Sequence, residues 1–411
     1  MSAGGPEAPR ADSSSQGSIW VVPGMLALAA VAFTGFAGYA SLLPVAPLWA
    51  VHGGADSAGA GLVNFVLMAA TVATQFGVPR IIRRLGWGHT LALGMVLMGV
   101  PALLHGFSDA LSVTLALSVV RGFGFGILTV AGSAAAVLIV APSRRGAAVG
   151  AYSASLSIPN VLLMPSGAWI ADLWGFWPVF LLSALPLAGI PACYLLSQHL
   201  PVRSTHDGRH QAPTEEPAPS RIATYAPLVA PTVILLSITL AAGALITFMP
   251  QMVAVGWLAA GGLFALGVVT AAMRWWIGGV ADRVGAARLV WPFVIIATVA
   301  LVAIAWLARH QVSGHQAALW FAACATLGIA YGALQNLTML QAFEAAGPRR
   351  VGAASSVWNA GFDTGTAIGS VLVGAIAVGW GFGVGMAITA ALCALTLPLA
   401  LKGRRSAVSA R

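Results

Sequence analysis

Charge is scarce in this sequence. Only 8 % of the 411 residues are charged, and lysine occurs once, at Lys402. Hydrophobic residues make up 59 %, well above the share in soluble globular domains, so the chain is an integral membrane protein that resides in a lipid bilayer. The net charge of +9 could suggest nucleic acid as a partner. Because the arginines lie in short segments beside apolar runs, membrane topology explains the charge better, and we expect no nucleic-acid binding.

The sequence also lacks the residue patterns of cofactor and metal chemistry. Its three cysteines, Cys193, Cys324 and Cys393, fall inside apolar runs without metal-ligand spacing. The histidines lie in loops or near segment ends, without the spacing of a helical zinc site. No Walker-type phosphate loop is present, so the chain does not use ATP directly. We therefore expect no enzyme activity, no metal and no cofactor, with a proton gradient as the energy source.

Twelve apolar segments are long enough to cross a hydrocarbon core ~30 Å thick. In lipid each must be helical, because the bilayer core offers the backbone no other hydrogen-bond partners. The sequence thus predicts an all-α membrane protein of twelve transmembrane helices. The expected spans are 19–48, 59–78, 90–106, 111–140, 146–171, 177–197, 226–250, 256–277, 288–309, 316–341, 351–378 and 382–401.

The distribution of arginine predicts the orientation. Assigning the loops alternately to the two faces puts nearly all arginines on one face, with Arg274 counted there and Arg309 opposite. The positive-inside rule makes that face cytoplasmic and puts both termini there, in a cell membrane. The polar segments 1–18 and 402–411 are expected tails, and 198–225 is an expected cytoplasmic linker between the halves 19–197 and 226–401. We expect a monomer.

Two charged hairpins indicate an internal duplication. Residues 278–288 form a short charged loop between two apolar segments, and residues 79–89 repeat its pattern about two hundred residues earlier. Gly86 matches Gly285, whereas Arg83 stands where the second copy has Asp282. Gly122 and Gly126 of the fourth segment likewise parallel Gly328 and Gly332 of the tenth, and the arginines that precede the fifth and eleventh segments also correspond.

The order of glycine, acid and basic residues in 278–288 resembles the loop signature of the major facilitator superfamily of transporters. Gly38 followed by Pro44-Val45-Ala46-Pro47 resembles a first-helix pattern of the same family. The resemblance covers residues 19–401. It implies two six-helix pseudo-repeats with a binding site near the membrane midplane, reached alternately from the two faces as the halves rock.

The resemblance also implies a gate. In the family the hairpin acid docks on the cytoplasmic end of a helix from the opposite half, which here would be the fifth segment near Arg145, where unpaired N–H groups attract a carboxylate. The expected gating residues are Gly278, Asp282, Arg283, Gly285 and Arg288. Arg83 could not make the equivalent contact in the first half. The simpler interpretation is that Asp282 is a solvated loop acid that balances its basic neighbours.

Arg121 lies near the middle of the fourth segment and resembles the arginine that family antiporters use in substrate or proton coupling. An ionised guanidinium at that depth requires a partner or a wet cavity. Arg121 is therefore a candidate functional residue. The alternative is that it bonds backbone carbonyls and ties the fourth segment to its neighbours.

Asp363 is the only acid deep within a segment, and Asn359 lies one helical turn before it on the same face. Removal from water disfavours the charged form of a carboxylate, so Asp363 is a candidate proton carrier. Its partner could be Arg121, or Asn64 and Thr71 on the second segment. A structural aspartate that holds the two halves together is the alternative.

Gln335 and Asn336 of the tenth segment are further candidate substrate contacts. Few charges line the expected cavity, which favours proton-coupled export of a small, partly apolar organic molecule. The fifth segment lacks the usual glycine-proline motif of drug antiporters. An importer of a small organic acid or another nutrient, with Arg121 holding the carboxylate, remains an alternative, as does a non-transporting receptor or assembly factor on the same fold.

Overall fold

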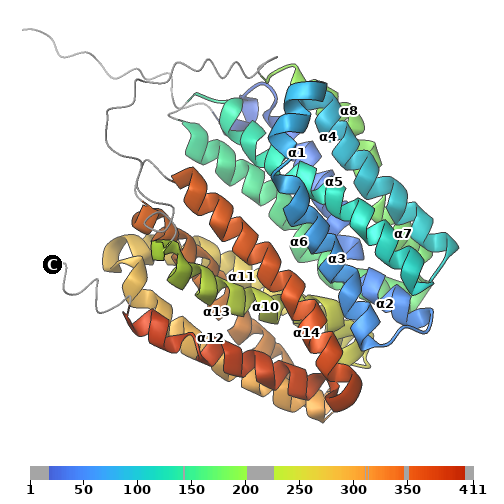
Figure 1. The fold of residues 1–411 in the computed structure, drawn as a ribbon, viewed down its shortest axis with the longest axis vertical. Coiled ribbons are helices and arrows are strands. Elements are labelled where there is room, and N and C mark those ends of the chain that lie inside the picture. Colours follow the sequence, from blue (N-terminus) through green and yellow to red (C-terminus); the bar gives the residue numbers. More distant parts are fainter. Residues whose placement is uncertain are drawn as a thin grey trace, which may run out of the picture.

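The computed structural model describes residues 18–141, 144–200, 226–310, 312, 314–346 and 351–402. Within these ranges every regular element is helical. Figure 1 shows two helical bundles side by side, the first coloured blue to green and the second yellow to red. The all-α membrane fold predicted from the sequence is confirmed.

Two of the six crossings of the first bundle are broken at prolines. Pro44 separates the helices of the first crossing, and Pro186 lies in the 3₁₀ turn Leu185–Gly189 that interrupts the sixth. Asp56 caps the second crossing, since its Oδ1 accepts a hydrogen bond of 2.8 Å from the N–H of Gly59. The helices are α1 (Met25–Leu42), α2 (Val45–His52), α3 (Ser57–Gln75), α4 (Val78–Leu104), α5 (Leu111–Leu138), α6 (Arg145–Trp174), α7 (Trp177–Ser183) and α8 (Ile190–Ser197).

The second bundle contains α10 (Val229–Met252), α11 (Gly256–Val284), α12 (Ala286–Arg309), α13 (Ala317–Ala346) and α14 (Val351–Ala394). With 44 residues, α14 would be about 66 Å long if straight, twice the hydrocarbon thickness. It reverses at Gly381, whose φ is 77°, and Figure 1 shows the red segment folding back beside α12. The eleven apolar helical stretches among the described residues, the last running to Lys402, thus make twelve crossings.

Both predicted charged loops are shorter than the sequence suggested. Helix α11 continues to Val284 and α12 begins at Ala286, so the second hairpin is a single turn at Gly285 with a φ of 91°. In the first copy α4 already begins at Val78 and bends at Gly86, with a φ of 78°. The expected loops are wrong because charged residues at a membrane surface extend the helices, and only glycine turns so sharply without strain.

The two bundles repeat the same internal contacts. The hydroxyl of Thr71 donates to the carbonyl of Gly122 at 3.2 Å, and that of Thr270 donates to the carbonyl of Gly328 at 3.3 Å. Each pair joins the second helix of its bundle to the fourth, where a glycine allows close approach. The helices therefore correspond residue by residue, with Thr270 following Thr71 by 199 positions and Gly328 following Gly122 by 206.

The bundles meet along two antiparallel helix pairs. At the end of the molecule that holds Asp56, here named the outer end, Gly61 and Gly374 of the α3–α14 pair lie against the carbonyls of Ser370 and Ser57. In the α6–α11 pair, Gly256 lies against Asp172.

The opposite end, which holds the Gly86 and Gly285 turns, is here named the inner end. A Cβ added at Gly150 of α6 or Gly279 of α11 would meet nothing within 4 Å there. The glycine contacts between the bundles thus gather at the outer end.

Candidate functional site

Asp363 lies half-buried on α14 at the seam between the bundles. The amide Nε2 of Gln75, the last residue of α3, donates to its Oδ2 at 3.0 Å. None of the expected partners is bonded to it: Arg121, Asn64 and Thr71 have other contacts. No ion pair involves Asp363 in the part of the chain that the structure describes. A charged group of one bundle is therefore held by a neutral group of the other.

Arg121 is fully buried on α5. Its Nη2 donates to the carbonyl of Gly38 at 3.0 Å, whereas Nε and Nη1 have no partner among the described residues. Tyr39, which stacks on Phe125 at a ring distance of 3.9 Å, lies within electrostatic range of both Arg121 and Asp363. Tyr39 is thus the side chain whose electrostatic range both ionisable groups share.

Asn64 forms a second polar contact across the seam. It is 2 % exposed, and its Nδ2 donates to the carbonyl of Leu43 at 3.0 Å and to the hydroxyl of Thr247 on α10 at 2.9 Å. Its Oδ1 has no partner in the described ranges. Asn64 therefore ties the outer part of the seam together and is not available to Asp363.

Gln335 and Asn336 lie on α13, on the side of the second bundle. Asn336 donates through Nδ2 to the backbone carbonyl of Arg274 at 2.8 Å, and Gln335 is 2 % exposed with no described partner for its Oε1. Arg274, which the sequence counts with the arginines of the cytoplasmic face, lies inside the predicted span 256–277, and its side of the membrane stays a prediction. It lies eleven residues before Gly285 within α11, where its exposed side chain is in electrostatic range of Tyr331.

Asn359 and Asp363 share one face of α14, as predicted, and Asn359 is exposed, with its amide bonded to the carbonyl of Ser355 at 2.8 Å. The opposite row of small residues packs on α10, where Gly365 and Gly369 lie against the carbonyls of Leu236 and Leu240. Helix α14 thus separates a packing face from a polar face that includes the site.

The expected gating residues lie at the inner end. Arg283 is exposed in the last turn of α11, and Arg288 is half-buried in the first turn of α12. A Cβ atom added at Gly278 would lie 3.6 Å from the amide nitrogen of Asn336. The side chain of Asp282 lies outside the described residues, so its docking on α6 stays a prediction.

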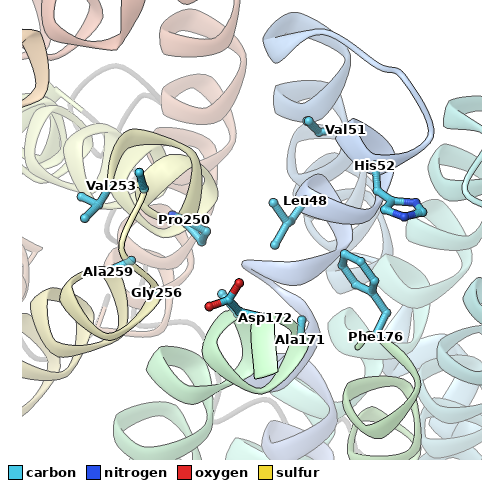
Figure 2. Close-up of a pocket in the computed structure, with 12 residues that line it drawn as sticks. Leu48, Val51, His52, Ala171, Asp172, Phe176, Pro250, Val253, Gly256 and Ala259 are labelled. Atoms are coloured by element: carbon cyan, nitrogen blue, oxygen red, sulfur yellow. The ribbon is translucent and has the colours of Figure 1, made fainter. Parts of the chain in front are cut away.

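A cavity of about 410 Å³ opens on the seam at the outer end (Figure 2). Leu48 and His52 of α2 and Phe176 line one side, and Pro250 and Val253 line the other. The carboxylate of Asp172, near the end of α6, points into it. Its Oδ2 lies close to Gly256, the first residue of α11, where helix N–H groups are unpaired. Here the bundles touch without filling the space between them.

Sequence reasoning missed Gln75, Tyr39 and Tyr331 as neighbours of Asp363, and it missed Arg274, which lies within electrostatic range of Tyr331. One signal could have found two of them. Gln75 precedes Gly86 by eleven residues, and Arg274 precedes Gly285 by the same number, so the repeat places both at one depth on corresponding helices.

Two helical bundles with polar side chains at their seam are the architecture of secondary transporters. A family model described as Major Facilitator Superfamily matches residues 28–370. The chain belongs to this superfamily, and the resemblance read from the hairpin motifs is confirmed.

Two curated relatives are described as uncharacterised MFS-type transporters of Pseudomonas aeruginosa, from strains LESB58 and PAO1. Each is 38 % identical over 77 residues, so the match spans 19 % of this chain and 19 % of the relative.

Among solved structures, an inward-facing, unoccupied bacterial homologue of the human lysosomal transporter Spinster matches with a TM-score of 0.77 and 15 % identity, over 94 % of this chain and 98 % of that one. The nucleoside transporter NupG (D323A mutant) matches with a TM-score of 0.70 and 12 % identity, over 92 % and 99 %. At these identities the likeness shows the fold.

Proposed function

We propose that the protein is a proton-coupled secondary transporter that exports a small, partly apolar organic compound by alternating access. The observation that carries the proposal is the pairing of Asp363 with Gln75 across the seam, without an ion pair among the described residues. A carboxylate bonded to a neutral amide can accept a proton without breaking a salt bridge. Asp363 is therefore suited to carry the coupled proton.

The same contact links the proton to the motion of the bundles. A hydrogen bond from an amide to an ionised carboxylate is stronger than one to the neutral acid, because the charge assists it. Protonation of Asp363 thus weakens a bond between α3 and α14. A proton taken up at this site loosens one of the two seams about which the halves rock.

The residues around Asp363 favour a substrate that is partly apolar. The aromatic side chains of Tyr39 and Tyr331 lie within electrostatic range of Asp363, and Asn359 offers an amide on the same face of α14. The Spinster homologue and NupG support a transport role through their shared fold, but their substrates are not carried over to this chain.

The gate that we propose lies on the α6–α11 pair. Asp172 faces Gly256 at the outer end, and farther in Val161 faces Gly267. The two helices are therefore antiparallel, and eleven residues forward along α11 correspond to eleven residues back along α6. Continued inward, this register puts position 282 opposite residue 146, at the start of α6. Asp282 would dock there when the inner end closes, in the way that Asp172 lies beside the first residue of α11 at the outer end. The gating roles of Arg283 and Arg288 belong to this proposal.

The proposed placement follows from the arginines at the inner end. Arg80, Arg83, Arg84, Arg145 and Arg283 are exposed there, and the positive-inside rule makes that end cytoplasmic. We place the protein in the cell membrane as a monomer with both termini in the cytoplasm.

Import of a small organic acid is the second candidate, and Arg274 favours it. Its exposed side chain forms no ion pair within the described ranges, so it could hold a substrate carboxylate at the depth of Gln75. In that case Arg274 binds the substrate, and a substitution there raises the KM for acids and leaves neutral compounds unaffected.

The test is proton movement in liposomes that contain a pH-sensitive dye. Pools of small drugs, organic acids and sugars are added to wild type, to Asp363→Asn and to Asp109→Asn, whose acid pairs with His52 within one bundle. We expect one pool to move protons with wild type and Asp109→Asn but not with Asp363→Asn, which retains counterflow of labelled substrate.

Equal proton movement with Asp363→Asn would make Asp363 structural. Counterflow without protons in wild type would indicate a uniporter or another coupling ion. Ligand binding without counterflow would instead support the receptor alternative.

A further inference from the structure

Four polar side chains lie in the interior of the first bundle without contact with solvent. His105, Thr114, Ser118 and Arg121 are each 0 % exposed. Each has a polar atom without a partner in the described chain: Nε2 of His105, the two hydroxyls, and Nε and Nη1 of Arg121. Buried polar atoms are nearly always hydrogen-bonded, so four in one region require an explanation.

These residues form one strip. Thr114, Ser118 and Arg121 share a face of α5 and span two turns, about 11 Å. The carbonyl of Gly94 on α4 lies against Gly124 of the antiparallel α5. Moving along α4 from Gly94 to His105 therefore moves back along α5 to the level of Thr114. His105 is also within electrostatic range of Arg121.

The hydroxyls of Thr114 and Ser118 differ from other helix hydroxyls of this protein in forming no hydrogen bond with a carbonyl of their own helix. Thr74, Ser155, Thr338 and Thr389 each donate to the carbonyl one helical turn earlier, at 2.6 to 3.0 Å. Such a carbonyl is also available to Thr114 and Ser118, yet neither hydroxyl is bonded to it. Their oxygens are free for a partner within the bundle.

Donors and acceptors along the strip have a consistent order. The Nδ1 of His105 lies 2.7 Å from the carbonyl of Pro101 and must donate to it, which leaves Nε2 of the neutral ring as an acceptor. Arg121 offers only donors at the other end. The hydroxyls between them both donate and accept. Water molecules between these groups could form a chain of hydrogen bonds that starts at the donors of Arg121 and ends at the acceptor of His105, so that every one of these polar atoms has a partner.

The second bundle has no such strip at the corresponding positions. The offsets of 199 and 206 residues place Ile304, Trp320, Cys324 and Leu327 where the first bundle has His105, Thr114, Ser118 and Arg121. All four are at most 1 % exposed and belong to the hydrophobic core of the second bundle. The fold itself therefore does not require polar groups at these positions.

We propose that His105, Thr114, Ser118 and Arg121 line a file of internal water molecules that solvates the buried guanidinium from the outer side of the first bundle. A water file fits better than a bound anion, because the strip ends on an acceptor at His105. The file gives the donors of Arg121 partners other than a carboxylate. This inference rests on the proposed function in one respect, since it explains why Asp363 has no basic partner in the described part of the chain and can carry a proton.

Hydroxyl-radical footprinting in detergent tests the file directly, because radicals made from internal water oxidise side chains next to it. Met98 lies between Gly94 and His105 on the same face of α4, and Met386 of α14 is the equally buried methionine of the second bundle used for comparison. Both are 0 % exposed. We expect several-fold faster conversion of Met98 to the sulfoxide than of Met386 in the wild-type protein. Equal protection of the two methionines would overturn the proposal without any variant.

Variants sharpen the test. Thr114→Val with Ser118→Ala removes the hydroxyls at nearly constant volume and should lower Met98 oxidation to the rate of Met386. Thr389→Val removes a hydroxyl of the second bundle that donates to the carbonyl one helical turn earlier, and it should change neither rate.

An anion at Arg121 would instead make thermal stability depend on chloride in wild type and not in Arg121→Leu, and that result would also overturn the water file. Neither readout measures transport. A failure here is therefore distinct from a failure of the Asp363→Asn experiment.

Discussion

The two bundles share a frame and differ in their interiors. The threonine-to-glycine contacts that join the second and fourth helices occur in both, Thr71 with Gly122 and Thr270 with Gly328. Inside that frame the first bundle holds Arg121 with no acidic partner among the described residues, whereas the same position in the second bundle is Leu327 in an apolar core. Backbone packing therefore sets the fold, and the side chains within it are free to differ.

The two seams between the bundles also differ. Helices α3 and α14 approach closely enough that glycines meet carbonyls, and a hydrogen bond from Gln75 to Asp363 joins them farther in. Helices α6 and α11 leave a cavity at their outer end, where Asp172 meets the start of α11 (Figure 2). The first seam is suited to a pivot and the second to a gate.

The sharpest test of the difference in interiors exchanges residues between the bundles. Leu327→Arg places an unpaired charge in an apolar core and should destabilise the protein by roughly 3–5 kcal/mol. Arg121→Leu should leave stability nearly unchanged while transport is lost. Thermal unfolding in detergent measures both variants. Tolerance of Leu327→Arg would mean that the second interior is hydrated too, and the contrast between the bundles would fail.

The shared frame can be tested at its glycines. A methyl group at Gly122 would meet the carbonyl of Leu67, and one at Gly328 would meet that of Leu266. Gly122→Ala and Gly328→Ala should each cost about 1–3 kcal/mol in the free energy of unfolding, because helix backbones must separate. Gly150→Ala, with open space around it, serves as the control and should not destabilise the protein. A large effect in one bundle only would contradict a common frame.

The smallest expected effect concerns the gate. Asp172→Asn removes the charge beside the start of α11, and the lost interaction with the helix dipole is about 0.3–1 kcal/mol. The population open at the outer end should rise by a few-fold at most, as measured by accessibility of a cysteine at position 257 to a membrane-impermeant thiol reagent. Asp109→Asn is the matched control, since that acid pairs with His52 within the first bundle. Equal labelling of both variants would remove Asp172 from the gate.

The sequence predicted most of the fold for physical reasons that act locally. Apolar length determines where the chain crosses the membrane, so all twelve crossings were found, including the pair that reverses at Gly381. Helix ends were predicted less well. The charged stretches around Gly86 and Gly285 are helical almost to the glycine, because charge at a membrane surface is compatible with a helix.

The site was predicted in part. Depth in a segment identified Arg121 and Asp363 as candidates, because ionisable groups are costly in lipid. Depth does not say which way a side chain points around its helix, so the partner of Asp363 was missed. Arg274 was counted only among the arginines of the cytoplasmic face, although the repeat places it level with Gln75.

The central claim is that the halves rock about the site, and distances across the α6–α11 pair test it most directly. Spin labels at positions 150 and 279 report on the inner end, and labels at 174 and 257 report on the outer end. The measurement is made at low pH with the substrate pool that moves protons in liposomes. The account predicts that a population with a shorter label-to-label distance appears at the inner end and one with a longer distance at the outer end. Distances that stay fixed, or that change in the same direction at both ends, would contradict it.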